Sequence, residues 1–424
     1  MKLTIGETTY TTLTNLKFDP VADVTGSEVP INEFSVDVKT ADNIDAMQYA
    51  WLKDDLDNLW AKYWVVYADR MDENTVSIKA QSSLKLLERR MLKAQMMNAE
   101  PVEDVIEDIF DELGADSYIL NESFEGKTLS GFAPYQSCKT RLQWVCFTLG
   151  AYIKSFFSDK IEILPVGNSP KLIPLSKTAW RPPLTYSEYR TRISVTAYSY
   201  EQGTPGTTDT WVKDDEGVVY IQSQLNHGLR NPDVPAGALT HESHITDVTL
   251  VNDDNVDDIL TRLGPYYFKR ISVELDAVNN AEFLPGTEVL FYTDVRHMAH
   301  GYIEKADFSF GTQAKSRLKI TPVEEVPCDT LTAICKYGGT QLKKLQYVYP
   351  IDWEYEIELP ALDQRWASTR YIFVPETATI TGAVEQGGST VEVDYIIALG
   401  QYRETLLILA ADEIEKEGGT VSIS

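Results

Sequence analysis

The fold is decided by the stretch from Leu59 to Leu92, LWAKYWVVYADRMDENTVSIKAQSSLKLLERRML. WVVYA is a run of β-forming residues and TVSIKA alternates apolar and polar residues, so the stretch predicts a hairpin of two strands. Residues 71–74 supply the turn, and Ser83 is the predicted cap of a short amphipathic helix that ends at Leu92. A hairpin that leads directly into a helix is typical of a β-barrel with a helix packed on it.

The composition indicates a mainly β chain of several domains. With 424 residues the chain is too long for one hydrophobic core, so we expect two to four domains. Tyrosine (23 residues) and tryptophan (8 residues) are frequent, and both favour strands and interfaces. Few stretches keep the helical period for long, so helices should be few.

The chain is strongly acidic, with 64 Asp and Glu against 38 Lys and Arg and a formal charge of −26. Such a charge keeps a protein soluble, and it also suits a surface or lumen that repels nucleic acid. Binding of DNA through a basic patch is not expected, because the densest basic cluster is the pair Arg89-Arg90.

Four cysteines in a chain of this length suit a reducing compartment and argue against a disulfide framework. The N-terminal sequence MKLTIGETTYTTL has no apolar core of a signal peptide, and no run approaches 18 apolar residues. We therefore expect synthesis in the cytoplasm and no membrane span.

The first two predicted domains are residues 1–95 and 96–166. KLTIG, TTYTTLTNLKF, NEFSVDVKT and MQYAWLK read as strands that join the opening hairpin in a β-barrel. EPVEDVIEDIFDELG and YQSCKTRLQWVCFTLGAY read as two amphipathic helices, the second capped by Ser137 and ended at Gly150. With a hairpin of AYIKSFF and KIEILPV they form a small α+β domain.

The other two predicted domains are residues 167–335 and 336–424. The third holds an antiparallel meander, a mobile loop GTPGTTDTWVKDDEG and one helix from Asn252 or Asp253 to Gly264-Pro265, and so resembles the first in pattern. The fourth has short strands with Gly and Pro turns, which favours a small β-sandwich, followed by a mobile acidic end. The fold class is therefore mainly β with α+β parts.

The histidines supply the only metal-ligand candidates. HESH contains His241 and His244, and HMAH contains His297 and His300. Two such pairs could bind zinc on helices, where residues three apart share a face, but both pairs are flanked by strand or turn sequence. Neither has the general-base glutamate of an HExxH motif, so we predict no metal or cofactor site.

No catalytic motif is present. Cys138 near a helix N-terminus could have a lowered pKa, but no histidine accompanies it in a peptidase pattern, so Cys138 and Cys146 are interpreted as helix-face residues. A disulfide between Cys328 and Cys335 is unsupported. Asp54-Asp55 and Asp253-Asp254 are interpreted as turn and cap residues.

The aromatic run of the opening stretch is interpreted as packing rather than as a stacking platform for sugars or bases. Trp60, Trp64 and Tyr67 are expected to lie in the barrel wall. On this interpretation Trp64→Ala should cost a core-sized free energy, roughly 3–5 kcal/mol.

The order of these segments resembles a known family. An N-terminal β-domain is followed by YWVVYADRMDENTVSIKAQSSLKLLERRML, EDVIEDIFDELG, CKTRLQWVCFTLGAYIKSFFSDKIEILPV and, at residues 300–320, HGYIEKADFSFGTQAKSRLKI. The chain resembles the baseplate hub, or tail-tip hub, proteins of tailed bacteriophages, phage-like bacteriocins and contractile injection systems. The resemblance covers about residues 1–325.

The resemblance implies two tail-tube-like β-barrels joined by smaller domains, and a homotrimer that connects the sixfold tail tube to the threefold spike. It implies tube, spike and other tail-tip proteins as partners, with the tape-measure protein as a further one, DNA as passing cargo, and a place in a virion or phage-like particle. The resemblance implies no catalytic residue in this chain. Two alternatives stay open, a cell-wall hydrolase associated with a tail and a host-glycan-binding module in residues 336–424.

Overall fold

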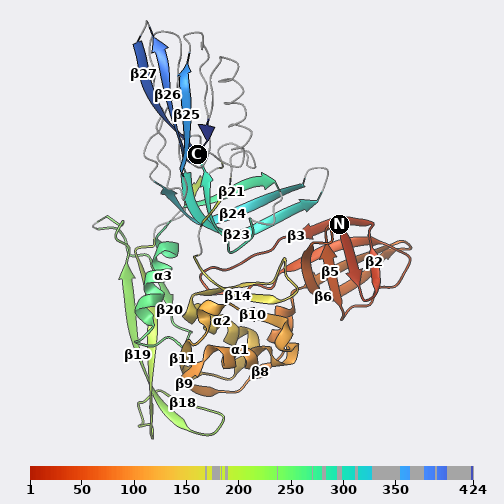
Figure 1. Ribbon diagram of the computed structural model, residues 1–424. Coiled ribbons are helices and arrows are strands. Elements are labelled where there is room, and N and C mark those ends of the chain that lie inside the picture. Colours follow the sequence, from red (N-terminus) through yellow and green to blue (C-terminus); the bar gives the residue numbers. More distant parts are fainter. Residues whose placement is uncertain are drawn as a thin grey trace. The chain divides into compact units, whose positions relative to one another are not determined.

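A computed structural model describes residues 1–167, 170–173, 182, 184–186, 190–235, 237–269, 271–278, 283–293, 298–310 and 314–326, and strands at 354–362, 377–386, 389–398 and 422–423. The chain divides into two compact units. The first consists of residues 1–171, 182–289 and 301–324, and the second of residues 172–181, 290–300 and 325–424. The predicted fold class is confirmed, because the described residues are mainly β with α+β parts (Figure 1).

The N-terminal strands form a curled antiparallel sheet in the order β3-β4-β7-β6-β5-β1-β2 (Figure 1). The strands are β1 (Lys2–Ile5), β2 (Thr8–Tyr10), β3 (Leu13–Phe18), β4 (Glu33–Lys39), β5 (Tyr49–Lys53), β6 (Leu59–Asp72) and β7 (Thr75–Gln81). Period-two burial runs through β4, whose Phe34, Val36 and Val38 are all buried. The apolar residues that alternate in the sequence therefore face one core.

The predicted hairpin of the opening stretch is confirmed, since β6 and β7 pair antiparallel with Ala68 opposite Ile78. The helix after it is shorter than predicted. A 3₁₀-helix, η1, spans Ser83–Glu88, and Met91–Leu92 is already the strand β8. The predicted cap is also wrong, because Ser83 is the first residue of the helix and Ser82 occupies the cap position without a capping side-chain hydrogen bond. The prediction of a helix to Leu92 is wrong because β8 pairs with a later strand, β12 (Gln136–Ser137), which a local pattern does not reveal.

The middle of the first unit is the predicted α+β region. Its elements are β9 (Gln95–Pro101), α1 (Val102–Phe110), β10 (Tyr118–Leu120), β11 (Thr128–Ala133), α2 (Cys138–Leu149), β13 (Ala151–Lys154) and β14 (Ile161–Pro165), with short 3₁₀-helices η2 (Asp111–Leu113), η3 (Ala115–Ser117) and η4 (Glu122–Phe124). Both predicted caps of α2 are confirmed. The Ser137 hydroxyl oxygen accepts a hydrogen bond from the Thr140 backbone amide, with an N···O distance of 3.2 Å. Gly150 ends the helix with a left-handed φ of 72°.

A second sheet has the order β18-β19-β17-β20. β17 (Arg192–Gln202) and β19 (Val219–Arg230) pair antiparallel over their whole length, and β20 (Glu242–Ile245) lies parallel to β17. β18 (Trp211–Lys213) falls inside the predicted mobile loop, which therefore contains an ordered strand.

The helix α3 (Val256–Phe268) packs on β17 and β19. A Cβ atom on Gly264 would come within 2.9 Å of Leu229 Cδ2, so glycine permits this close approach. The side-chain oxygen of Asn252 accepts hydrogen bonds from the backbone amides of Asp254 and Asn255 just before the helix, in the manner of a capping residue. The predicted stop at Gly264-Pro265 is wrong, because the helix continues through the proline to Phe268.

The remaining strands are β15 (Lys171–Ile173), β16 (Leu184–Tyr186), β21 (Ile271–Val278), β22 (Glu288–Tyr292), β23 (Met298–Phe310) and β24 (Ala314–Val326). Their order is β16-β21-β24-β23, with β22 paired to β15 and β23. The predicted strands are all present, but β21 pairs with β24 rather than with the next strand of a meander. β23 continues the sheet to β3, where Phe308 lies opposite Phe18.

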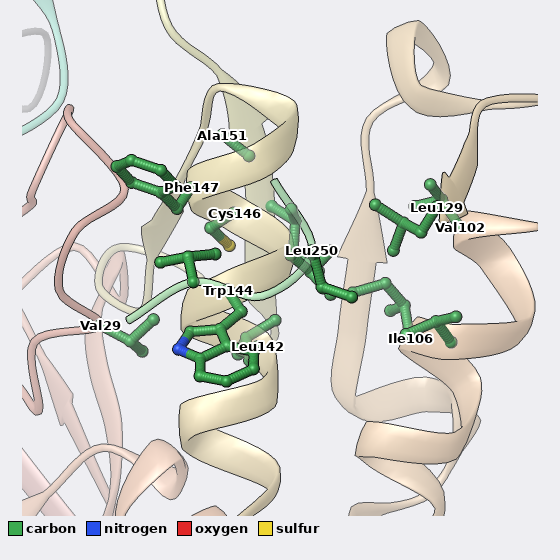
Figure 2. Packing of buried hydrophobic residues seen from close by; sticks show 14 of the residues in the cluster. Val29, Val102, Ile106, Leu129, Leu142, Trp144, Cys146, Phe147, Ala151 and Leu250 are labelled. Atoms are coloured by element: carbon green, nitrogen blue, oxygen red, sulfur yellow. The ribbon is translucent and has the colours of Figure 1, made fainter. Parts of the chain in front are cut away.

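One large hydrophobic cluster joins segments that are distant in the sequence. Leu142, Val145 and Cys146 of α2 are fully buried among residues of α1, β17 and α3. Figure 2 shows Leu250 between the side chains of α2 and Ile106 of α1. The α+β region therefore shares its core with the second sheet.

In the second unit, β25 (Glu354–Leu362), β26 (Thr377–Gln386), β27 (Ser389–Ala398) and β28 (Ser422–Ile423) form a sheet in the order β27-β26-β25-β28. β26 and β27 pair antiparallel and are two of the short strands expected in this region. The segments STRYIFVP (368–375) and ETLLILAA (404–411), which read as further strands of the region, and most of the acidic end lie outside the described residues. No helix in the described part of the chain is long and apolar enough to cross a membrane.

Candidate assembly site

The first histidine pair does not converge on one point. His241 precedes β20 and its Nε2 contacts the guanidinium of Arg190. His244 lies on β20, where its Nδ1 bonds the Ser194 hydroxyl and its Nε2 lies 3.6 Å from a Glu242 carboxylate oxygen. The two imidazoles therefore engage different partners, and a guanidinium beside His241 opposes a metal cation there.

Only one histidine of the second pair, His297 and His300, lies among the described residues. His300 lies on β23, and His297 falls outside them. Among the residues that the structure describes, no group of three or more His, Cys, Asp and Glu side chains is arranged to hold a metal ion.

The two described cysteines lie in the core. Cys138 is the first residue of α2 and Cys146 lies two turns later, and neither side chain is exposed. Burial raises the pKa of both thiols, and at Cys138 this outweighs the nearby Arg90, so the lowered pKa considered from the helix N-terminus is wrong. They pack as helix-face residues, as predicted.

Because only thiolates alkylate rapidly, iodoacetamide should leave Cys138 and Cys146 unmodified at neutral pH while the chain is folded. Both should react fully in denaturant, and peptide mapping by mass spectrometry would follow each site separately. Rapid native labelling of Cys138 would show that its thiol is accessible and would contradict its burial.

The first pair of aspartates has the predicted turn role, because Asp54 Oδ1 accepts hydrogen bonds from the amides of Leu56 and Asn58 between β5 and β6. The predicted cap role of Asp253-Asp254 is wrong. The side chain that accepts the amides before α3 is that of Asn252, and the Asp253 carboxylate instead lies 3.4 Å from His227 Nε2.

An aromatic junction, defined as Phe18, Trp60, Phe157 and Phe308, connects four distant segments. Phe18 stacks on Phe308 with ring centroids 5.9 Å apart, and Trp60 lies 4.6 Å from Phe157 and 5.1 Å from Phe308. Phe18 is fully buried and Phe308 is 4% exposed. The Phe157 amide donates to the Trp60 carbonyl at 2.9 Å, with Phe157 at a φ of 55°, which is uncommon for an aromatic residue.

The aromatic junction connects segments of the chain by side-chain packing rather than catalysing a reaction. It joins the curled N-terminal sheet at β3 and β6 to the loop after β13 and to β23. The sequence identified Trp60 as a packing residue, but it did not identify Phe18, Phe157 and Phe308. Their proximity depends on the pairing between β3 and β23. The local signal for the burial of Phe18 is its place at the end of β3, next to the exposed Lys17.

The other wall aromatics are less buried than predicted. On β6 the core positions are Ala61, Tyr63 and Val65, all fully buried. Trp64 therefore points to the opposite face, half-buried and edge-on to Tyr49 at 5.1 Å. Tyr67 is 46% exposed, so its predicted place in the packed wall is wrong.

Trp64→Ala should consequently cost about 1–2 kcal/mol of unfolding free energy, the size of one aromatic contact with partial burial, instead of a core-sized loss. Denaturant unfolding followed by circular dichroism would measure this. A loss of roughly 4 kcal/mol, typical of a core truncation, would mean that Trp64 is covered by something that the chain alone does not provide.

Comparison of the sequence with protein-family models and with curated proteins finds no match. Solved structures do match. A 43 kDa tail protein of prophage MuSo2 from Shewanella oneidensis aligns over 76% of this chain and 97% of its own, with 9% identity and a TM-score of 0.51. A tail protein from Neisseria meningitidis aligns over 75% and 95%, with 9% identity and a TM-score of 0.54.

This chain has the fold of phage tail proteins. The similarity to these two tail proteins confirms the resemblance to phage tail proteins at the level of fold. A third structure, with 10% identity, a TM-score of 0.47, 80% of this chain covered and 86% of its own, is an E. coli component of the type VI secretion system described as similar to the T4 tail proteins gp27 and gp5.

Within this tail-protein fold, two arginines hold the core segments through backbone carbonyls. Arg141 is 1% exposed, and its Nη2 donates to the carbonyls of Lys93 and Pro134 at 3.0 Å each. Arg262 of α3 donates to the carbonyls of Thr25 and Phe147, the latter in the last turn of α2. Burial lowers the pKa of both guanidinium groups, a cost offset by these charge-assisted hydrogen bonds.

Proposed function

We propose that this protein is a structural hub of a phage tail tip or baseplate, or of a phage-like injection particle, and that it has no enzymatic activity. The observation that carries the proposal is the fold, which spans 97% of the Shewanella tail protein. The aromatic junction supports it, because its packed rings, of which Phe18 and Phe308 are buried, fix several segments of the chain relative to one another, as a structural protein requires.

On this proposal the chain contains the four parts foreseen from its sequence, two tube-like barrels at residues 1–95 and 167–335, a small α+β domain at 96–166 between them, and a C-terminal β domain at 336–424. Three copies of a chain with two barrels supply six barrels. A homotrimer could thus meet a sixfold tail tube on one side and a threefold spike on the other.

The acidic charge then has a role. A ring formed by chains of charge −26 would present an electronegative lumen, which does not retain passing DNA. The partners are the tail tube protein, the spike and other tail-tip proteins, with the tape-measure protein as a further one. The hub would be assembled in the bacterial cytoplasm and end in the virion or particle.

Native mass spectrometry of the purified protein, alone and mixed with the tube and spike proteins of the same particle, tests the proposal. We expect a mass three times that of the monomer, and a complex with tube protein that survives size-exclusion chromatography. A chain that stays monomeric at high concentration and binds neither partner would overturn the proposal. Clearing of peptidoglycan in a zymogram would favour the hydrolase alternative instead.

A further inference from the structure

The long strand β19 has an outer edge that is only partly paired. Its inner edge pairs with β17 from Tyr220 to Arg230, whereas its outer edge pairs with β18 only at residues 219–221 and through the Gln222 amide, which donates to the Thr210 carbonyl at 2.8 Å. Figure 1 shows β19 extending well beyond the short β18. We define the open edge as residues 223–230 of β19, which have no strand paired on that side among the described residues.

The backbone of the open edge points amides and carbonyls outward at every second residue. Gln224 lies opposite Tyr198 of β17, whose amide donates away from β19, to the Val251 carbonyl at 2.8 Å. Two opposed residues of an antiparallel pair either bond each other or both point away. The backbone groups of Gln224 therefore face outward, and by alternation so do those of Asn226 and Gly228. In the part of the chain that the structure describes, no donor or acceptor reaches these groups.

The open edge lacks the features that usually prevent a strand from pairing with another chain. Proline, lysine, a bulge or a covering segment commonly protects such an edge. Residues 223–230, SQLNHGLR, contain neither proline nor lysine, and the register of β19 with β17 runs to Arg230 without a shift. The residues from Ser223 to Asn226 are all exposed. Outward groups spaced by two residues match an extended strand rather than a helix, because a helix bonds its own backbone.

One end of the open edge is cationic. Arg230 lies directly opposite Arg192 of β17, and like charges in this arrangement disfavour strand pairing. The Arg192 side chain is compensated by Glu242, whose carboxylate lies 3.3 Å from its Nε. Arg230 is exposed and forms no ion pair within the described residues. A carboxylate on an added strand, opposite Arg230, would supply the missing negative charge.

The side chains of the open edge differ between its two faces. Leu225 is 59% exposed and shares one face with His227 and with Leu229, against which α3 packs. Gln224 and Asn226 lie on the other face and are exposed. An added strand that alternates apolar and hydroxyl residues would therefore contact Leu225 on one face and hydrogen-bonding side chains on the other.

A second copy of this chain does not supply such a strand through the same edge. The stretch from Gln222 to Arg230 contains no carboxylate. Two open edges paired with each other would thus place only uncharged or basic residues opposite Arg230, and residues 219–221 are already paired with β18. We therefore expect the partner strand in a different protein.

We infer that the open edge is a docking site for an extended segment of a different protein, which adds to β19 as an antiparallel strand with a carboxylate beside Arg230. The antiparallel direction follows that of both present neighbours, β17 and β18. The inference goes beyond the proposed function, since it concerns a contact made by the single chain and does not require a hub to assemble.

The probe is the labelled peptide Glu-Ala-Thr-Val-Thr-Val-Thr, which places glutamate opposite Arg230, alanine beside α3 and a valine opposite Leu225. Fluorescence anisotropy would measure its binding to the full chain. N-methylation of the three threonines removes the amides that face β19 and should abolish binding. N-methylation of the two valines alters only the far edge and should leave binding within about twofold. These matched peptides test the backbone contact without changing the protein.

Gln224→Pro removes one outward amide and should weaken binding of the unmethylated peptide about fivefold or more. The pairing with β17 stays intact, because this amide points away from β17. Gln224→Ala is the matched control, since it keeps the amide and should bind as the wild type does. Arg230→Glu should weaken binding about threefold or more, and it should strengthen binding of the peptide in which lysine replaces glutamate.

Equal binding of the threonine-methylated and valine-methylated peptides would overturn the inference, as would the absence of binding or equal affinities of Gln224→Pro and Gln224→Ala. If the peptide did not bind but Gln224→Pro lowered self-association of the chain in sedimentation, the occupant would be a second copy and the inference would be wrong. Specific peptide binding by a chain that stays monomeric supports the inference even where the hub proposal fails.

Discussion

Replacing Phe18 with alanine should lower the free energy of unfolding by about 3–5 kcal/mol. The side chain is fully buried, and its ring contacts Trp60, Phe157 and Phe308 with centroids 5.9–6.2 Å away. Truncation removes these contacts and leaves a cavity that rings from three other segments cannot easily fill. Urea unfolding followed by circular dichroism and tryptophan fluorescence measures the loss.

Tyr67→Ala is the matched control, since it removes another aromatic ring from the same sheet at a position that is 46% exposed. Its cost should stay below about 1 kcal/mol. If Phe18→Ala were no more destabilising than Tyr67→Ala, the junction would not be a core and its role in holding β3 to β23 would be refuted. If the chain assembles as the proposed hub does, the Phe18 variant should also form less trimer in native mass spectrometry, because a less stable fold leaves fewer folded chains to assemble.

Arg141→Ala should be destabilising by a similar amount, about 3–5 kcal/mol. The side chain is among the largest fully buried ones of the described residues, and its loss creates a cavity and also removes the donor to the carbonyls of Lys93 and Pro134. Thermal and urea unfolding of the purified variant would measure the change.

Lys139→Ala provides the comparison on the same helix. Lys139 is also a cation with a partner, 3.0 Å from a Glu88 carboxylate oxygen, but this pair is partly exposed to solvent and should contribute only about 0–1 kcal/mol. Equal losses of unfolding free energy for Arg141→Ala and Lys139→Ala would contradict the conclusion that burial makes Arg141 important for stability.

Local features of the fold could be predicted from the sequence. The hairpin of β6 and β7, the Ser137 cap and the Gly150 end of α2 each depend on a few neighbouring residues, and each is confirmed. The predictions that are wrong concern features that are determined by contacts between residues distant in the sequence. Pro265 lies inside α3 because Tyr267 and Phe268 continue its apolar face onto the core, and this packing outweighs the missing amide of proline.

The candidate site could be predicted only in part. The alternation in β6 places either Tyr63 or Trp64 toward the core, and the stretch alone does not decide which, because a shift of one residue exchanges the two faces. Trp60 gains its partners from β3, the loop after β13 and β23, and none of these is adjacent in sequence. The spacing of His241 and His244 suggested a metal site, but along the extended segment that leads into β20 this spacing does not bring the two imidazoles together.

The pairing of Phe18 with Phe308 also determines when the chain can finish folding. β3 is among the first strands to leave the ribosome, whereas β23 follows only after most of the first unit has been synthesised. Until then Phe18 and Trp60 lack one of their ring partners, and the β3 edge stays open to wrong pairing. A chain cut short before Phe308 would expose this edge and be recognised as incomplete by chaperones and proteases, so completion of synthesis and burial of the junction are coupled.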